Sequence, residues 1–273
     1  MPRKFSLAYL TIPGTSPVEQ IRIAAEAGYD SVSLRPIPMF LPNEPLFQFD
    51  KDPTLFNAIK RALSEHNMKL MDIELARVRE DLKVEDYESA FAAAAELGAT
   101  DVLSSVWTDN KAFTLENFGN ICDLAAKYGL RVNLEFVTFS STPGLEGALE
   151  ILNTVNRPNA YLAVDTLHAH RSGVTAAAMA KVDPSLFGFI HVCDAPKAIP
   201  SLDDPEMIGV AREGRLYPGE GGIDLKGMLL AMPENDISIE LPNAKEMNER
   251  GALGHAIQCL VKTKLFMADN GIY

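Results

Sequence analysis

The sequence has little cysteine, a single tryptophan and no long apolar run. Its three cysteines are an odd number without the paired spacing of a metal site, which argues against a disulfide framework and is typical of a reducing compartment. The apolar segment 5–10 is too short for the core of a signal peptide or for a membrane span. We therefore expect a cytoplasmic protein whose cysteines are ordinary buried thiols.

Positive charge is also scarce. The chain has 25 lysine and arginine residues against 37 aspartate and glutamate residues, for a net charge of −12. A net negative charge of this size repels phosphate backbones and anionic lipid surfaces, so we expect neither nucleic acid nor membrane as a partner. With 47% hydrophobic and 23% charged residues, the 273-residue chain can bury a large core, which excludes disordered, collagen-like and coiled-coil proteins.

Short apolar or alternating runs recur about every 33 residues, close to the length of one strand, crossover and strand unit. No linker rich in proline, glycine or serine divides them. This pattern predicts a single-domain (β/α)₈ TIM barrel over residues 1–273. An open, doubly wound sheet is the alternative, but no G-x-G-x-x-G motif follows the first run. The eight runs begin at Phe5, Ser31, Lys69, Thr100, Arg131, Tyr161, Phe187 and Ile237.

The intervals between the runs carry helix-boundary signals. Ser16 and Glu19 form a capping-box pattern with Pro17 at the first helical position, and Gly28 stands where the helix should stop. Two intervals are long loops, 36–51 and 193–222, which we expect to hang over the catalytic face. The first reads as an apolar lid or an oligomer contact, and the second shows no helical signal. Further helices are expected after Asp52, across 84–98 and 114–129, and after Asn243.

Near the ends of the last four runs, polar residues occupy every second position, on the side opposite to the apolar residues. Because strand side chains alternate between two faces, the apolar positions of these runs face the helices and one ionisable residue in each faces the barrel interior. Three carboxylates buried together require a cation, which predicts a divalent metal site. The donor set suits Mn²⁺, Mg²⁺, Co²⁺ or Zn²⁺ without choosing among them. The four expected ligands are Glu135, Asp165, His191 and Glu240.

Several segments around these residues resemble the xylose isomerase-like TIM barrel family, which includes sugar phosphate isomerases and epimerases, ketose 3-epimerases and inosose dehydratases. The resemblance covers essentially the whole chain. It implies the same four metal ligands, and it adds substrate-binding groups at His168 and Arg215. It rests on NLEFV at Glu135, VDTLH at 164–168, HVCD at 191–194, RLYPGEGGIDL at 215–225 and SIELPN at Glu240.

Each of these side chains also has a simpler interpretation. His168 can be a rim histidine and Arg215 a solvated loop charge. Trp107 can supply an apolar wall for a sugar ring or merely cover the barrel. Arg35 and Glu74 are further candidates for substrate binding, although Glu74 can instead form a structural ion pair with Arg77.

The leading hypothesis is a metal-dependent isomerase or epimerase of a small sugar or hydroxy-carbonyl compound. In the family branch with this activity, two glutamates, here Glu135 and Glu240, exchange a proton through a metal-stabilised enediolate. A lyase of the inosose or 3-dehydroshikimate dehydratase type is the alternative, with His168 as base or leaving-group acid. A DNA-repair endonuclease is disfavoured by the missing histidines and the charge, and a non-catalytic sugar-binding barrel by the intact ligand set. Related barrels form dimers or tetramers, so we expect a homo-oligomer.

Overall fold

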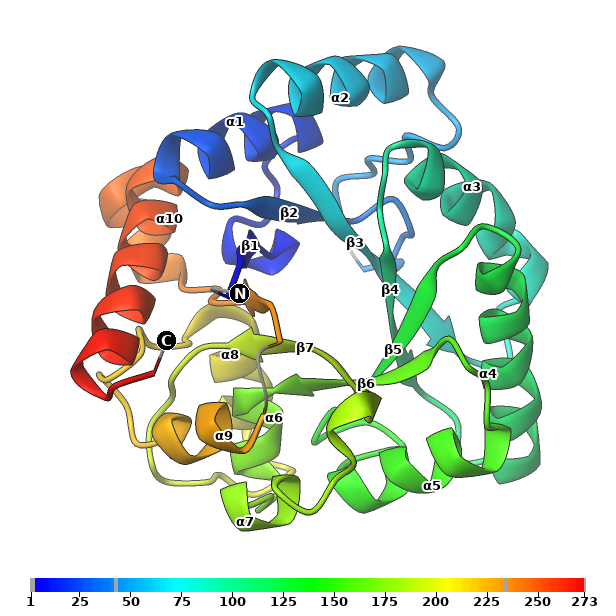
Figure 1. The fold of residues 1–273 in the computed structure, drawn as a ribbon. Coiled ribbons are helices and arrows are strands. Elements are labelled where there is room, and N and C mark those ends of the chain that lie inside the picture. Colours follow the sequence, from blue (N-terminus) through cyan, green and yellow to red (C-terminus); the bar gives the residue numbers. More distant parts are fainter. Residues whose placement is uncertain (1–2, 42–43, 233–234, 273) are drawn as a thin grey trace.

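Eight parallel strands close into a barrel with helices around it, as predicted (Figure 1). The structure is a computed structural model that describes residues 3–41, 44–232 and 235–272. Each strand pairs with the next one in the chain, and β1 pairs with β8 to close the ring. The strands are β1 (Phe5–Leu7), β2 (Ser31–Leu34), β3 (Lys69–Val78), β4 (Asp101–Val106), β5 (Arg131–Glu135), β6 (Ala160–Asp165), β7 (Phe187–Val192) and β8 (Ile237–Ile239).

The helix boundaries follow the predicted local signals. Ser16 Oγ accepts from the backbone N–H of Glu19, and Gly28 ends the first helix at φ +88°, a conformation that favours glycine. The α-helices are α1 (Pro17–Ala27), α2 (Pro53–Glu65), α3 (Glu88–Glu96), α4 (Lys111–Ala126), α5 (Leu145–Val155), α6 (Thr166–Arg171), α7 (Ala176–Met179), α8 (Pro205–Glu213), α9 (Leu225–Ala231) and α10 (Ala244–Asp269). Three 3₁₀ helices are η1 (Tyr9–Thr11), η2 (Val84–Tyr87) and η3 (Pro184–Leu186).

Two expectations about elements are wrong. The first apolar run does not continue as a strand to Leu10, because β1 ends at Leu7 and η1 follows. The segment 193–222 contains α8, although it was expected to be without helix. Asp204 caps this helix through its side chain and Pro205 occupies the first turn, which repeats the Asp52-Pro53 signal that opens α2. The helical signal was therefore present in the sequence.

The alternation of side chains divides the core into two parts. Buried apolar residues such as Leu134, Val164 and Ile190 pack between the strands and the surrounding helices. A much smaller apolar cluster that includes Leu103 and Phe189 fills the barrel interior. Polar side chains occupy the rest of the interior, and those at the carboxyl ends of the strands form the candidate site.

The first and the last α-helix of the chain pack together in the helical ring. Helix α10 lies beside α1 (Figure 1), and Tyr29 Oη donates to the carbonyl of Ala256 over 3.0 Å. Within the described residues, no helix combines the length and apolar character that crossing a bilayer requires. All three cysteines are buried free thiols.

Candidate metal centre

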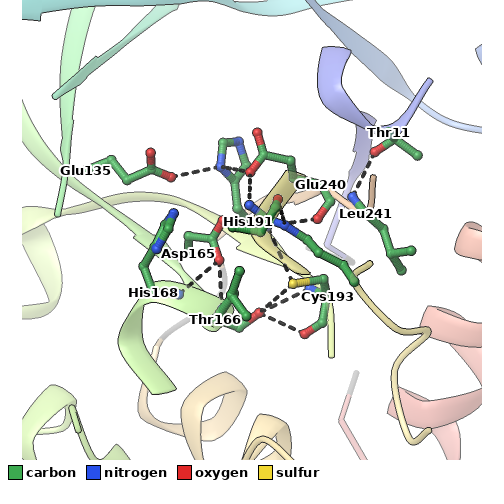
Figure 2. A network of polar contacts seen from close by, with 12 residues as sticks. Thr11, Glu135, Asp165, Thr166, His168, His191, Cys193, Glu240 and Leu241 are labelled. Carbon is green, nitrogen blue, oxygen red and sulfur yellow. Dashed lines mark hydrogen bonds and ion pairs between the residues drawn. The ribbon is translucent and has the colours of Figure 1, made fainter. Parts of the chain in front are cut away.

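Four ionisable side chains from consecutive strands meet at one end of the barrel (Figure 2). Glu135 and Asp165 are the last residues of β5 and β6, His191 lies near the end of β7, and Glu240 follows β8 directly. One potential ligand atom from each lies within 4.8 Å of the others, and the four residues are between 0% and 7% exposed. The structure thus brings together the four residues that the sequence predicts as metal ligands.

Asp165 is held in place from two sides. Its Oδ1 accepts the backbone N–H groups of Leu167 at 2.7 Å and His168 at 3.4 Å, so the carboxylate caps α6. Its Oδ2 accepts from Nη1 of Arg215 at 2.6 Å. Burial alone raises the pKa of Asp165, but Arg215 and the nearby histidines outweigh it and hold that pKa below its usual range.

His191 lies between the two glutamates (Figure 2). Its Nδ1 is 3.1 Å from Oε1 of Glu135 and 3.6 Å from Oε2 of Glu240. Burial alone lowers the pKa of His191, but Glu240, Glu135 and Asp165 outweigh it and raise that pKa to about 10. Burial raises the pKa of Glu240 to about 8, although His191 and Arg215 act in the opposite direction. This centre therefore holds protons at neutral pH that a bound cation would displace.

Arg215 is part of this centre and is only 2% exposed, so its interpretation as a solvated loop charge is wrong. Besides Asp165, its guanidinium forms an ion pair with Glu240, with Nη2 2.9 Å from Oε2, and donates to the Glu240 carbonyl at 3.0 Å. Its Nε donates to the carbonyl of Ala211 at 2.9 Å. The guanidinium therefore neutralises one of the three carboxylates and fixes the positions of two.

The centre fits a divalent cation. Nδ1 of His191 faces the carboxylate oxygens of Glu135 and Glu240, so this nitrogen and those oxygens can be ligands of one ion. With His191 neutral, the three carboxylates and Arg215 together leave a net charge of about −2 at the centre, the charge that a divalent ion balances. Oxygen donors with one imidazole suit Mn²⁺, Mg²⁺, Co²⁺ and Zn²⁺.

Asp194 fixes the loop that carries Arg215, a role that sequence reasoning did not assign. Its carboxylate accepts the backbone N–H groups of Ala195, Gly219, Gly221 and Ile223 at 2.9–3.1 Å. A Cβ on Gly221 would lie only 2.4 Å from Oδ1 of Asp194, so this close approach requires glycine. The aspartate after β7 followed by the glycine-rich PGEGG segment is the signal that could have predicted this contact.

His168 and two aromatic rings line one side of the barrel mouth. His168 is buried, its Nδ1 is 3.3 Å from Oγ1 of Thr138, and its ring meets Phe139 edge-on at 5.4 Å. Phe139 in turn lies 6.2 Å from the half-buried ring of Trp107, whose Nε1 donates to Ser105. Burial lowers the pKa of His168, so this histidine is neutral at physiological pH. His168 and Trp107 therefore belong to one continuous wall.

Arg35 and Glu74 form a buried ion pair elsewhere in the barrel. Nη2 of Arg35 lies 2.6 Å from Oε2 of Glu74, and its guanidinium stacks over the ring of Tyr9 at 4.5 Å. The predicted alternative, a pair between Glu74 and Arg77, is wrong. Arg77 instead donates to the carbonyls of Pro38 and Met39 over 3.3 Å. The partner of Glu74 thus comes from the neighbouring strand end and not from its own strand.

The apolar segment 36–51 lies partly against the barrel and partly in solvent. Met39 packs on the apolar cluster of the barrel interior, and Phe49 is buried in the main core. Phe40 is 70% exposed and lines a hollow of about 840 Å³ between this segment and α3. Pro42 and Asn43, which belong to the predicted lid, lie outside the described residues.

Comparison with known proteins places this arrangement in a family. The sequence model of the family described as xylose isomerase-like TIM barrel matches residues 21–263. Inosose isomerase of Bacillus subtilis (strain 168) is 31% identical over 137 residues, which are 48% of this chain and 47% of that protein. A 3-dehydroshikimate dehydratase of Pseudomonas aeruginosa is 26% identical over 238 residues, 82% of this chain and 35% of the relative. The matches therefore span about half or less of each relative's length.

Solved structures with the same fold include a metal-containing protein. IolI, crystallised with a bound zinc atom, superposes with a TM-score of 0.80 at 22% identity and covers 97% of this chain and 98% of its own. D-allulose 3-epimerase from Methylomonas sp. gives a TM-score of 0.67 at 19% identity, over 97% and 98% of the two chains. At these identities the likeness establishes the fold.

Proposed function

The chain belongs to the xylose isomerase-like TIM barrel family, and we propose from this premise that it is a divalent-metal-dependent isomerase or epimerase of a small sugar or hydroxy-carbonyl compound. One observation carries the proposal. Glu135 and Glu240 approach the same point from β5 and β8, on either side of His191, which is the placement that proton exchange between two faces of a substrate requires (Figure 2).

Glu135, Asp165, His191 and Glu240 are the residues that would hold the ion. When bound, a divalent ion polarises carbonyl and hydroxyl oxygens and so makes the neighbouring C–H bond more acidic. A family relative named L-ribulose 3-epimerase, from Methylomonas sp. (strain DH-1), is 30% identical over 134 residues, 47% of this chain and 40% of the relative. The names of this relative and of inosose isomerase support a polyhydroxylated carbonyl substrate here.

The protein's own groups supply the remaining steps. One glutamate of the pair Glu135 and Glu240 removes the proton from the substrate carbon, and the other returns a proton on the opposite side. Neutral His168 is placed to exchange a proton with a substrate hydroxyl. The donors of Arg215 are directed to protein oxygens, so we assign Arg215 to positioning Asp165 and Glu240. Trp107 and the pair of Arg35 and Glu74 remain candidates for substrate contact.

A dehydratase is the second candidate, because the dehydratase relative matches 82% of this chain, whereas inosose isomerase of Bacillus subtilis and L-ribulose 3-epimerase match 48% and 47%. Proton removal beside a carbonyl is the first step of both reactions. In a dehydratase, neutral His168 would accept the proton from the substrate carbon and then transfer it to the departing β-hydroxyl group, which leaves as water. The two candidates differ in product: water loss creates a conjugated product of lower mass, whereas an epimer retains the mass of its substrate.

Proton exchange in D₂O tests the proposal. We expect the protein to carry about one divalent ion per chain and to incorporate deuterium into at least one ketose, inosose or hydroxy acid. Glu135→Gln should slow exchange by about 10²-fold or more while the ion, measured by elemental mass spectrometry, stays bound. Glu96→Gln, an exposed surface change, is the matched control. Unaltered exchange in Glu135→Gln would refute the assigned role, and absence of the ion after reconstitution would refute the function.

A further inference from the structure

A second hollow, of about 380 Å³, lies at the same end of the barrel as the metal centre. Its walls come from segments that follow β5, β6 and β7, including Thr138, Arg171 and the stretch 199–202. Thr138 also contacts Nδ1 of His168, and Arg171 ends the helix that Asp165 caps. The hollow is therefore adjacent to residues that surround the centre.

A buried cation without an ion-pair partner among the described residues lines this hollow. Arg171 is 6% exposed, yet it forms no ion pair with any carboxylate in the part of the chain that the structure describes. Its Nη1 donates to the carbonyl of Met207 at 2.6 Å and more weakly to that of Glu206 at 3.4 Å. Its Nε is buried without a partner. Because an uncompensated buried charge is destabilising, this position favours an external anion.

Arg171 differs from two other buried arginines, Arg35 and Arg215, whereas Arg77 likewise donates to backbone carbonyls. Arg35 is paired with Glu74, and Arg215 is paired with Asp165 and Glu240. Burial lowers the pKa of Arg171 and the nearby charge of Arg215 lowers it further, whereas Glu206 and Asp165 raise it. Within the described residues, the groups that accept hydrogen bonds from Arg171 are neutral, and its guanidinium is the charged group among the residues that line the hollow.

The rest of the hollow suits an organic anion. The hydroxyls of Thr138, Ser172 and Ser201 line it, and Ser172 Oγ is 3.1 Å from Oγ1 of Thr138. Ile199 and Leu202 form a rim and are 48% and 67% exposed. A guanidinium, hydroxyls and apolar side chains at the rim match an oxyanion carried on a small carbon skeleton.

We propose that this hollow binds a carboxylate or phosphate group of the substrate, with Arg171 as its counter-charge. The inference rests on the proposed function, because it assumes that the reacting carbons lie at the metal centre. Arg171 follows Asp165 by six residues, a separation of about 9 Å along α6. This backbone separation is short enough for a small sugar acid or sugar phosphate to react at one end and be held by its anionic group at the other.

Binding of inorganic phosphate and of propionate to the purified protein, measured by calorimetry, tests the subsite. Leu202→Asp places a negative charge on the exposed rim and leaves the contacts of Arg171 unchanged, so we expect binding to weaken at least tenfold. Leu230→Asp is the matched control, because Leu230 is 60% exposed on α9. Binding of either anion to a cation in the metal centre would be the same in both variants.

Arg171 itself is tested in a second pair of variants. Arg171→Gln should abolish binding, and Arg171→Lys, which keeps the charge but not the planar fork, should bind more weakly than the wild type. The preferred anion, phosphate or propionate, identifies the kind of substrate group. The subsite is overturned if neither anion binds the wild type, or if Leu202→Asp binds as tightly as Leu230→Asp.

The subsite and the proposed function fail in different ways. If deuterium exchange depends on Glu135 but the rim variants do not alter anion binding, the function stands and the subsite is wrong. If anions bind through Arg171 but no substrate exchanges, the subsite stands and the function is wrong. Where both hold, Leu202→Asp should lower kcat/KM for an anionic substrate about tenfold and leave a neutral analogue unaffected.

Discussion

Nη1 of Arg215 lies 2.6 Å from Oδ2 of Asp165, so a cation of the protein already contacts one of the four potential metal ligands. The same guanidinium reaches Glu240, the ligand from the last strand. The positive charge of Arg215 lowers the repulsion among the three buried carboxylates of the centre when no metal ion is bound. It also makes Arg215 a component of the candidate metal site that is not itself a potential ligand.

Removal of Arg215 should destabilise the protein most when metal is absent. Arg215→Met leaves buried carboxylates without their counter-charge, which typically costs about 3–5 kcal/mol of unfolding free energy. Excess divalent ion should restore much of this loss by binding the folded state. Urea unfolding with and without metal checks both statements. Arg157→Met, which breaks an exposed pair with Asp123, should have no comparable effect. Equal losses in the two variants would contradict the assigned role.

Metal binding should release protons at neutral pH. The pKa of His191 is raised to about 10 and that of Glu240 to about 8, so both groups hold protons at pH 7 in the metal-free centre. A ligand must lose its proton to bind the ion, and metal affinity should therefore rise by about tenfold or more per pH unit between pH 6 and 8. Calorimetry in buffers of different ionisation enthalpy measures the proton count. Affinity independent of pH would show that the ion binds elsewhere.

His168 should affect the reaction and not the metal. His168→Gln is expected to slow turnover by about 10²- to 10⁴-fold, the usual contribution of a general acid or base, with the ion content unchanged. Because burial lowers the pKa of His168, the wild-type rate should decline only below the usual pKa of histidine. His170→Gln is the control, since that half-buried ring bonds only to the carbonyl of Lys197 in the described part of the chain. Loss of the ion in His168→Gln would indicate a structural role.

Asp194 should couple loop stability to metal affinity. Both carboxylate oxygens of Asp194 accept backbone N–H groups. Asp194→Asn replaces one of these oxygens by an NH₂ group, which cannot accept those hydrogen bonds. We expect about 1–3 kcal/mol of destabilisation, together with weaker metal binding, because the loop that positions Arg215 is released. Asp204→Asn, which changes the cap of α8 in the same segment, should leave metal affinity unaltered. Urea unfolding and metal titration of both variants distinguish a local from a general effect.

The sequence predicted the ligand cluster because strand alternation is a local property. Once β5 to β8 were assigned, the parity of Glu135, Asp165, His191 and Glu240 followed without knowledge of the whole fold. The parallel barrel then required their ends to meet. The helix caps at Ser16 and Asn243 are also local, because each depends on a cap residue and a residue three positions later.

Contacts between distant segments were not predictable in this way. The pairing of Glu74 with Arg35, 39 residues away, depends on the adjacency of β2 and β3, whereas Arg77 was nearer in sequence. For Arg215 the sequence left open a substrate-binding group or a solvated loop charge, because nothing in its loop shows that Asp194 folds that loop onto the barrel. Helix α8 is a different case, since its Asp-Pro start is a local signal that was present and overlooked.

The potential ligands all come from β5 to β8, whereas Arg35, Glu74 and Trp107 belong to β2, β3 and β4 or their ends. The potential ligands therefore occupy one half of the ring, and these three candidates for substrate contact occupy the other half. A laboratory library restricted to the ends of β2 to β4 would vary these candidates while all four potential ligands stay unchanged.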